Sequence, residues 1–70
     1  MEREIVKLHE KKKRRVVLKS GRVYTCTIFF ISEPNAQGNA LVQARDKNGN
    51  FITFSTDDVE AIETIMGGEE

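Results

Sequence analysis

Cysteine and histidine are almost missing from this 70-residue sequence, in which Cys26 and His9 are the only residues of their types. A single cysteine cannot form an intrachain disulfide, and one cysteine with one histidine cannot supply a typical zinc site. We therefore expect no disulfide, no metal and no cofactor. The scarcity also argues against an enzyme, because serine and cysteine nucleophiles usually need a histidine base, and none of the serines has a plausible histidine partner.

Long hydrophobic runs are missing as well. The longest, Ile28–Ile31, has four residues, whereas a membrane-spanning helix needs about 18. No long apolar segment follows the N-terminal Met1–Glu4, so the start of the sequence does not resemble a signal peptide. With one unpaired cysteine, these absences predict a cytoplasmic protein without a membrane partner.

The short length limits the size of the core. Seventy residues allow one domain, and a chain of this size buries only about 60% of the surface that its unfolded form exposes. Small domains usually need a disulfide, a metal or self-association to supplement such a core. Since the first two are excluded, we expect self-association.

Charge is distributed unevenly although the formal net charge is zero. Residues 1–22 carry nine cations against three carboxylates, a net charge of +6, and residues 23–70 carry −6. The densest part is the run Lys11, Lys12, Lys13, Arg14 and Arg15. Such a run either contacts phosphates or is a solvated helix end whose cations complement the helix dipole. An electropositive end can equally attract the acidic part of a second copy.

Local patterns predict one helix followed by five strands. Residues 2–13 favour a helix with Ile5, Leu8 and His9 on one face, although an N-terminal strand is the alternative. Strands are expected at 15–19, 22–33, 40–45, 51–55 and 59–65. Ser20-Gly21 predicts a two-residue turn, and Asn48-Gly49 predicts a type I′ hairpin turn.

The longest expected strand, over residues 22–33, carries the core pattern. Period-two alternation places its core face on Tyr24, Cys26, Ile28 and Phe30. Both faces become apolar after Ile28, which predicts burial on both sides at that end, by a bend of the sheet or by a partner. Between the fourth and fifth strands, Thr56-Asp57-Asp58 predicts one capped helical turn.

These elements define the expected organisation. It comprises a basic N-terminal helix over residues 1–14, a domain over 15–65 and a flexible tail over 66–70. The fold class is mostly β, an N-terminal α-helix followed by a five-stranded, strongly bent antiparallel sheet that forms a small open barrel.

Three segments carry a resemblance to a known family. Residues 17–28 pair two strands around Gly21, Gly38-Asn39 precedes an apolar strand, and Asn48-Gly49-Asn50 starts another. In this arrangement, over about residues 5–65, the chain resembles the Sm and Sm-like proteins, which include the RNA chaperone Hfq. It departs from their pattern in three places: Cys26 replaces a second glycine, the loop over residues 32–38 is longer than usual and lacks the aromatic residue that stacks a base, and Asn48 replaces a cation.

The resemblance implies the Sm-like fold and a ring of six or seven subunits, in which the fourth strand of one subunit pairs with the fifth of the next. It also implies binding of single-stranded RNA. Asn39 and Gly49 match the family's base pocket, and Asn48 stands where the family usually has a cation. The predicted RNA contacts are therefore Lys11, Lys12, Lys13, Arg14, Arg15, Asn39, Asn48 and Gly49.

Two other functions compete with this hypothesis. The acidic remainder of the chain favours a small barrel that acts as a protein-interaction or assembly module without a nucleic-acid ligand. Binding of duplex DNA is a third reading. The features that discriminate among them are the basic run Lys11–Arg15 and Asn39.

Overall fold

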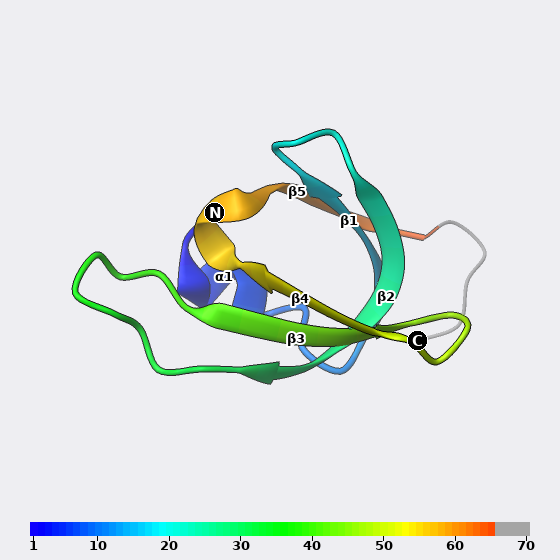
Figure 1. The fold of residues 1–70 in the computed structure, drawn as a ribbon, viewed down its shortest axis with the longest axis horizontal. Helices are drawn as coiled ribbons and strands as arrows, with labels where there is room; N and C mark the ends of the chain where they lie inside the picture. The colour runs from blue at the N-terminus through cyan, green and yellow to red at the C-terminus, as the bar shows by residue number, and fades with distance from the viewer. Residues whose placement is uncertain (66–70) are drawn as a thin grey trace.

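A computed structural model describes residues 1–65, which form one short helix and five strands (Figure 1). The strands form a single antiparallel sheet in the order β4-β3-β2-β1-β5. The elements are α1 (Arg3–Lys7), β1 (Lys13–Leu18), β2 (Val23–Ile31), β3 (Leu41–Asp46), β4 (Phe51–Ser55), the 3₁₀ helix η1 (Thr56–Asp58) and β5 (Val59–Thr64). The prediction of a mostly β fold with an N-terminal helix is confirmed. The flexible tail predicted over residues 66–70 lies outside the described residues.

The sheet bends strongly but does not close on itself. Figure 1 shows β2 curving around one side of the molecule, so that β1 and β5 lie opposite β3 and β4. In the strand order, β4 and β5 are the two edges, and neither pairs with the other within residues 1–65. The structure therefore has two free sheet edges, β4 and β5, which the turn η1 connects along the chain.

Two hairpins have longer loops than their sequences predict, with three residues in place of two. Around Gly49, the Gly49 N–H donates to Asp46 O and the Asp46 N–H donates to Asn50 O, so the loop has three residues, Lys47–Gly49. Gly49 has φ +86°, but Asn48 has no positive φ. A type I′ turn needs positive φ at both central residues, so that prediction is wrong. Gly21, with φ +98°, closes the β1–β2 hairpin by the same pattern rather than by a two-residue turn.

A β-bulge changes which aromatic residues of β2 face the core. In the register with β3, Ile28 pairs with Ala44 and Phe30 pairs with Gln43, so one extra residue, Phe29, lies between them. An extra residue shifts the alternation of all side chains that follow it. Ile31 therefore packs against the core, while Phe29 and Phe30 are exposed. The predicted inward position of Phe30 is wrong, and a bend of the sheet does not bury both faces after Ile28. Burial of that end by a partner stays a prediction.

The core lies on the concave face of the bent sheet. Each strand supplies at least one buried apolar residue, and α1 contributes Val6. The buried set is Val6, Val16, Cys26, Ile28, Ala40, Val42, Ala44, Phe54 and Val59. The predicted helix face is wrong, because Ile5 and Leu8 are exposed and the buried residue is their neighbour Val6.

The thiol of Cys26 offers a simple test of this packing. Its side chain is buried on β2, and burial, with a smaller contribution from the charge of Asp46, raises its thiol pKa to about 11. Since the thiolate is the reactive form, a thiol reagent at pH 8 should label Cys26 very slowly in the native protein. Labelling should become fast in denaturant. Rapid labelling of the native protein would contradict the core described above.

The N-terminal segment leaves the helical path earlier than expected. α1 ends at Lys7, and residues 8–12 form a turn in which Lys11 has φ +67° and its N–H donates to Ile28 O at 2.7 Å. That hydrogen bond docks the turn onto β2 and directs the chain into β1. The prediction of a helix over residues 1–14 is therefore wrong, because a helix cannot continue through a left-handed residue.

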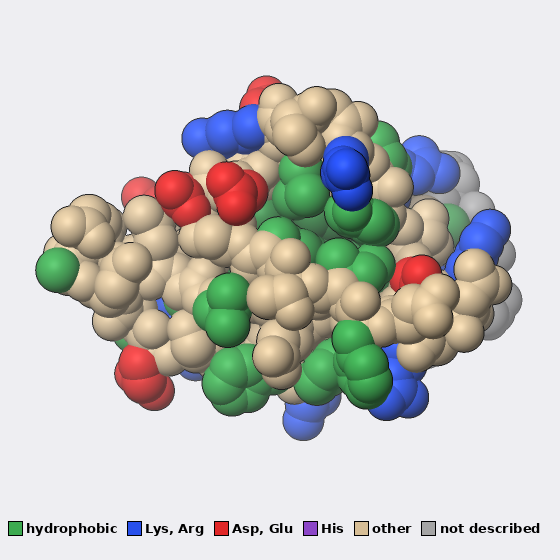
Figure 2. All heavy atoms as spheres, viewed as in Figure 1, with side chains coloured by type: hydrophobic (Ala, Val, Ile, Leu, Met, Phe, Trp, Pro, Cys, Tyr) green, Lys and Arg blue, Asp and Glu red, His purple; other side chains and the backbone are tan. Residues whose placement is uncertain are grey.

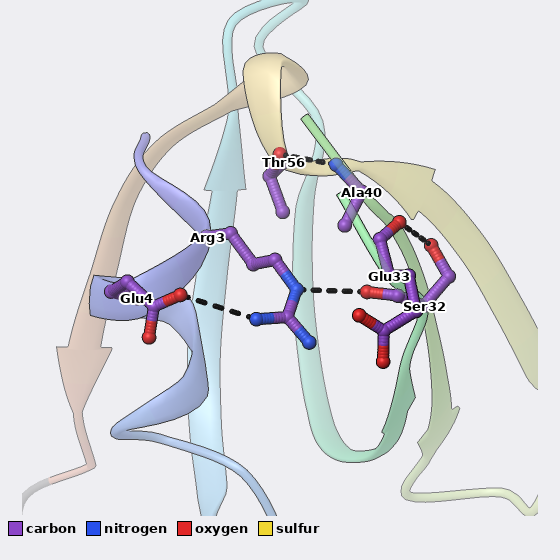
Figure 3. Close-up of polar contacts among 6 residues, drawn as sticks. All are labelled: Arg3, Glu4, Ser32, Glu33, Ala40 and Thr56. Carbon is purple, nitrogen blue, oxygen red and sulfur yellow. Dashed lines mark hydrogen bonds and ion pairs between the residues drawn. The ribbon is translucent and has the colours of Figure 1, made fainter. Parts of the chain in front are cut away.

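Hydrogen bonds fasten α1 and η1 to the ends of β2 and β3 (Figure 3). Arg3 Nε donates to Ser32 O at 2.8 Å, and its guanidinium also pairs with Glu4 at 3.2 Å. The buried Thr56 accepts a bond from the Ala40 N–H through its hydroxyl at 3.0 Å, and its own N–H donates to Ala40 O. The bonds of Arg3 hold α1 beside the end of β2, and those of Thr56 hold the β4–β5 turn beside the residue that precedes β3.

Candidate nucleic-acid interface

The basic run extends from the turn after α1 into the first half of β1. Lys11 and Lys12 lie in the turn, and Lys13 begins the strand. These three lysines and Arg15 are exposed, whereas Arg14 points inward and only 8% of it is accessible. The run is therefore an exposed group of four cations with one buried arginine among them.

Arg14 has a structural environment. Its Nε donates to His9 Nδ1 at 3.2 Å, and Nη1 donates to the Lys13 carbonyl at 3.0 Å. Among the predicted RNA contacts, it is the one whose side chain the fold directs away from solvent. Its neighbour Arg15 is exposed but lies 3.4 Å from the Glu63 carboxylate on β5. Lys11, Lys12 and Lys13 are consequently the main candidates for phosphate contacts.

The titration of His9 should make the stability of the fold depend on pH. Partial burial, followed by the charges of Arg14 and Lys12, lowers the pKa of His9 below its ordinary 6.5. Because the pKa of His9 is lower in the folded state, the unfolded chain binds the proton more readily. The contribution of His9 to stability is therefore complete above its pKa in the unfolded chain. It is lost as the pH falls through its pKa in the folded chain. We expect the unfolding midpoint in denaturant to fall below pH 6.5 more steeply in the natural chain than in His9→Gln. Equal slopes would show that His9 is not coupled to folding.

The residues assigned to a base pocket do not come together. Asn39 precedes β3, and Asn48 and Gly49 follow it in the β3–β4 hairpin. Six strand residues separate the two positions, a length of about 20 Å at the usual rise per residue. Figure 1 places the loop before β3 and the β3–β4 hairpin at opposite ends of the molecule. A pocket that joins Asn39 to Asn48 or Gly49 is therefore not formed within one chain.

The Asn39 backbone is hydrogen-bonded to Asn35 within its own loop, and Asn39 borders a hollow that it shares with the N-terminal segment, Lys19 and Asp57. An open hollow of about 610 Å³ is lined by Met1, Glu2, Arg3, Glu4, Lys19, Pro34, Gln37, Gly38, Asn39 and Asp57. The amine of Met1 donates to Thr56 O at 2.9 Å near this hollow. Its acidic and cationic groups are about equally numerous, so it offers phosphate no net attraction. Asp57 of the turn Thr56–Asp58, which was interpreted from the sequence only as a capped turn, therefore shares this hollow with Asn39.

A second group of exposed residues was missed from the sequence. Phe29 of β2 and Phe51 of β4 meet edge to face with ring centroids 5.7 Å apart, and the Arg45 guanidinium lies 4.8 Å from the Phe51 centroid. The alternation of Arg45 and Phe51 with inward-facing residues on either side of the hairpin is a signal that could have identified two of the three. Period-two alternation also places Phe29 on the face opposite Ile28, but its exposure was missed because both faces were expected to be buried after Ile28.

Other kinds of site find no support within residues 1–65. This part of the chain contains no cluster of three or more histidine, cysteine or acidic residues that could hold a metal ion. Its one α-helix is too short to cross a bilayer. Comparisons with protein-family models, curated proteins and solved structures find no match to this chain.

Proposed function

We propose that this chain is an Sm-like, non-catalytic RNA-binding protein that works as a ring-shaped homo-oligomer. The observation that carries the proposal is the strand order, which leaves β4 and β5 as the two free edges of a bent antiparallel sheet. These are the strands through which the resemblance implies that neighbouring subunits pair. Closing a ring satisfies both edges of every subunit at once.

The hydrogen-bonding direction of the edge strands supports such pairing. The Asp46 N–H bonds to Asn50, so Asp46, Ala44 and Val42 direct their backbone groups toward β4. Antiparallel pairs alternate between bonded and non-bonded, which makes Gln43–Thr53 a non-bonded pair. The N–H and C=O of Thr53 therefore point to the free edge.

The other edge shows the same property. The Leu18 N–H donates to Arg22 O, so Leu18 and Val16 direct their backbone groups toward β2. Val16 is the partner of Ile62 on β5. By the same alternation, the backbone groups of Ile62 point away from β1. Each subunit thus presents unpaired donors and acceptors on two strands.

A partly apolar opening, which Ser20, Arg22, Thr53 and Asp58 also line, favours association as well. It has a volume of about 340 Å³ and lies between the β1–β2 hairpin and β4, lined by Leu18, Tyr24 and Phe54 with polar residues around them. Figure 2 shows hydrophobic side chains at the bottom of this opening. A neighbouring subunit that pairs with β4 would cover them, and burial of apolar surface is the main driving force of association.

RNA binding rests on the exposed lysines. Lys11, Lys12 and Lys13 repeat once per subunit in a ring and would form a band of cations. Filter binding of short U-rich and A-rich RNAs over a salt series tests this part of the proposal. Affinity should be measurable near 50 mM salt and should fall linearly on a log–log plot as salt rises. Absence of binding at low salt would refute RNA binding.

The alternative is an assembly module without nucleic acid. The balanced charge around Asn39 and the separation of Asn39 from Asn48 and Gly49 favour it, because no base pocket forms within one chain. This alternative predicts the same oligomer but no affinity for RNA at any salt concentration. The filter-binding experiment therefore separates the two functions.

A further inference from the structure

The outer face of the sheet carries a row of residues that crosses four strands. Lys13 pairs with Thr27, Thr27 pairs with Arg45, and Arg45 pairs with Phe51. Their immediate neighbours Arg14, Ile28, Ala44 and Ile52 are buried or partly buried, so the row itself faces outward. At the usual spacing of strands it spans about 14 Å. Lys13 belongs both to this row and to the basic run.

Two phenylalanines at one end of the row form an exposed aromatic surface. Phe51 is 67% exposed and Phe29 is 42% exposed, although the two rings are in contact. The Arg45 guanidinium packs on Phe51 at a distance typical of a cation–π contact. Figure 2 shows hydrophobic side chains gathered along the lower edge of the molecule, over β3 and β4, with basic side chains beside them. These contacts hold the rings in place before any ligand arrives.

The polar groups around the rings suit a nucleic-acid base. Two shallow hollows of about 450 and 400 Å³ share Phe29 and are otherwise lined by Gln43, Phe51 and Thr53 in one and by Thr27 and Arg45 in the other. Neither lining contains a carboxylate. The amide and hydroxyl groups can donate to or accept from the edge of a base, and every base has a face that stacks on an aromatic ring.

We propose that this face is a stacking platform for single-stranded RNA, on which Phe51 and Phe29 stack bases while Lys13 and Arg45 contact the adjoining phosphates. The inference rests on the proposed RNA binding and assigns the bases a location. A second copy is a poorer occupant of the same face, because face-to-face packing would bring Lys13 and Arg45 of both copies together in a desolvated contact. An anionic chain with flat apolar groups complements both the charge and the rings.

Fluorescence provides a direct test, because the chain contains no tryptophan. We expect quenching of the Phe51→Trp variant by oligo(A) RNA. Leu41→Trp is the matched control, since Leu41 is an exposed hydrophobic residue of the same sheet at the other end of β3. Its fluorescence should change little. Inorganic polyphosphate, which has the charge but no bases, should quench neither variant.

Affinity measurements complete the test. Phe51→Leu keeps an apolar side chain but removes the ring, so it should weaken binding of oligo(A) by roughly tenfold, the usual effect of losing one stacked base. Its affinity for polyphosphate should stay unchanged. The same affinity for oligo(A) as the natural chain, or an equal loss for both ligands, would overturn the platform while leaving RNA binding intact.

Two further results would also overturn the platform. Absence of all RNA binding by the natural chain would remove the proposed function and the platform with it. A Phe51→Trp emission that is already blue-shifted without RNA, together with a lower oligomer mass for Phe51→Leu, would show that another copy covers this face.

Discussion

Replacing Thr53 with proline is expected to dissociate the oligomer into monomers. The N–H of Thr53 points to the free edge of β4, so its loss removes no hydrogen bond within the chain, and proline is tolerated on edge strands in this orientation. The missing donor and the proline ring prevent another strand from pairing there. Light scattering should show the mass falling to about that of the 8.0 kDa chain.

Thr53→Val is the matched control for this experiment. Valine keeps the N–H and suits a strand, so the oligomer should persist. Circular dichroism of Thr53→Pro should still show a folded β protein, which separates dissociation from unfolding. If Thr53→Pro keeps the mass of the natural oligomer, β4 is not the pairing edge.

Replacing Lys11, Lys12 and Lys13 together with alanine should give the largest change in RNA binding. All three side chains are exposed, so the fold should survive. Each lost phosphate contact lowers the slope of log affinity against log salt by about 0.7 for single-stranded nucleic acid, which amounts to about two units for three contacts. Affinity at low salt should fall roughly 10- to 100-fold.

A variant with the same change in net charge separates local contact from overall charge. Lys7, Lys19 and Lys47 are exposed lysines outside the basic run, and their triple replacement with alanine should leave most of the slope in place. Equal effects of the two triple variants would mean that RNA senses only the net charge. No effect of either would exclude a role for the lysines of the basic run.

Local patterns were sufficient to predict the strands and their order along the chain. The fourth strand, Phe51–Ser55, has the predicted bounds, and Ile52 and Phe54 face the core as their alternation indicates. Period-two patterning succeeds there because the strand is regular and one of its faces is buried. Positive φ was also anticipated at Gly49, although the complete turn depends on the hydrogen bonds of Asp46.

The misses share a cause, since each depends on contacts between distant segments. The bulge at Phe29 arises from the register between β2 and β3, which the sequence of β2 alone does not fix. Burial of Arg14 follows from the packing of the turn after α1, including its bond to His9. The left-handed Lys11 is stabilised by its hydrogen bond to Ile28 on β2. Propensity alone predicts a helix there, and tertiary contacts override it.

The expected base pocket does not form within one chain, and the reason is the topology of the sheet. The resemblance relates Asn39 and Gly49 by motif, but β3 lies between them, and the hydrogen bonds of Asn39 stay within its own loop, to Asn35. The aromatic surface of Phe29 and Phe51 is formed by residues from β2 and β4, with β3 between those strands in the sheet. Neither arrangement can be predicted from the sequence without knowing the order of the strands in the sheet.

The mass of the natural chain in solution tests the central claim most directly. A ring of six or seven copies of an 8.0 kDa chain has a mass of about 48 or 56 kDa. Light scattering at micromolar concentration should give one such closed species, and dilution within that range should not shift it gradually. A stable monomer of about 8 kDa, or a series of sizes that grows with concentration, would contradict pairing of the β4 and β5 edges in a ring.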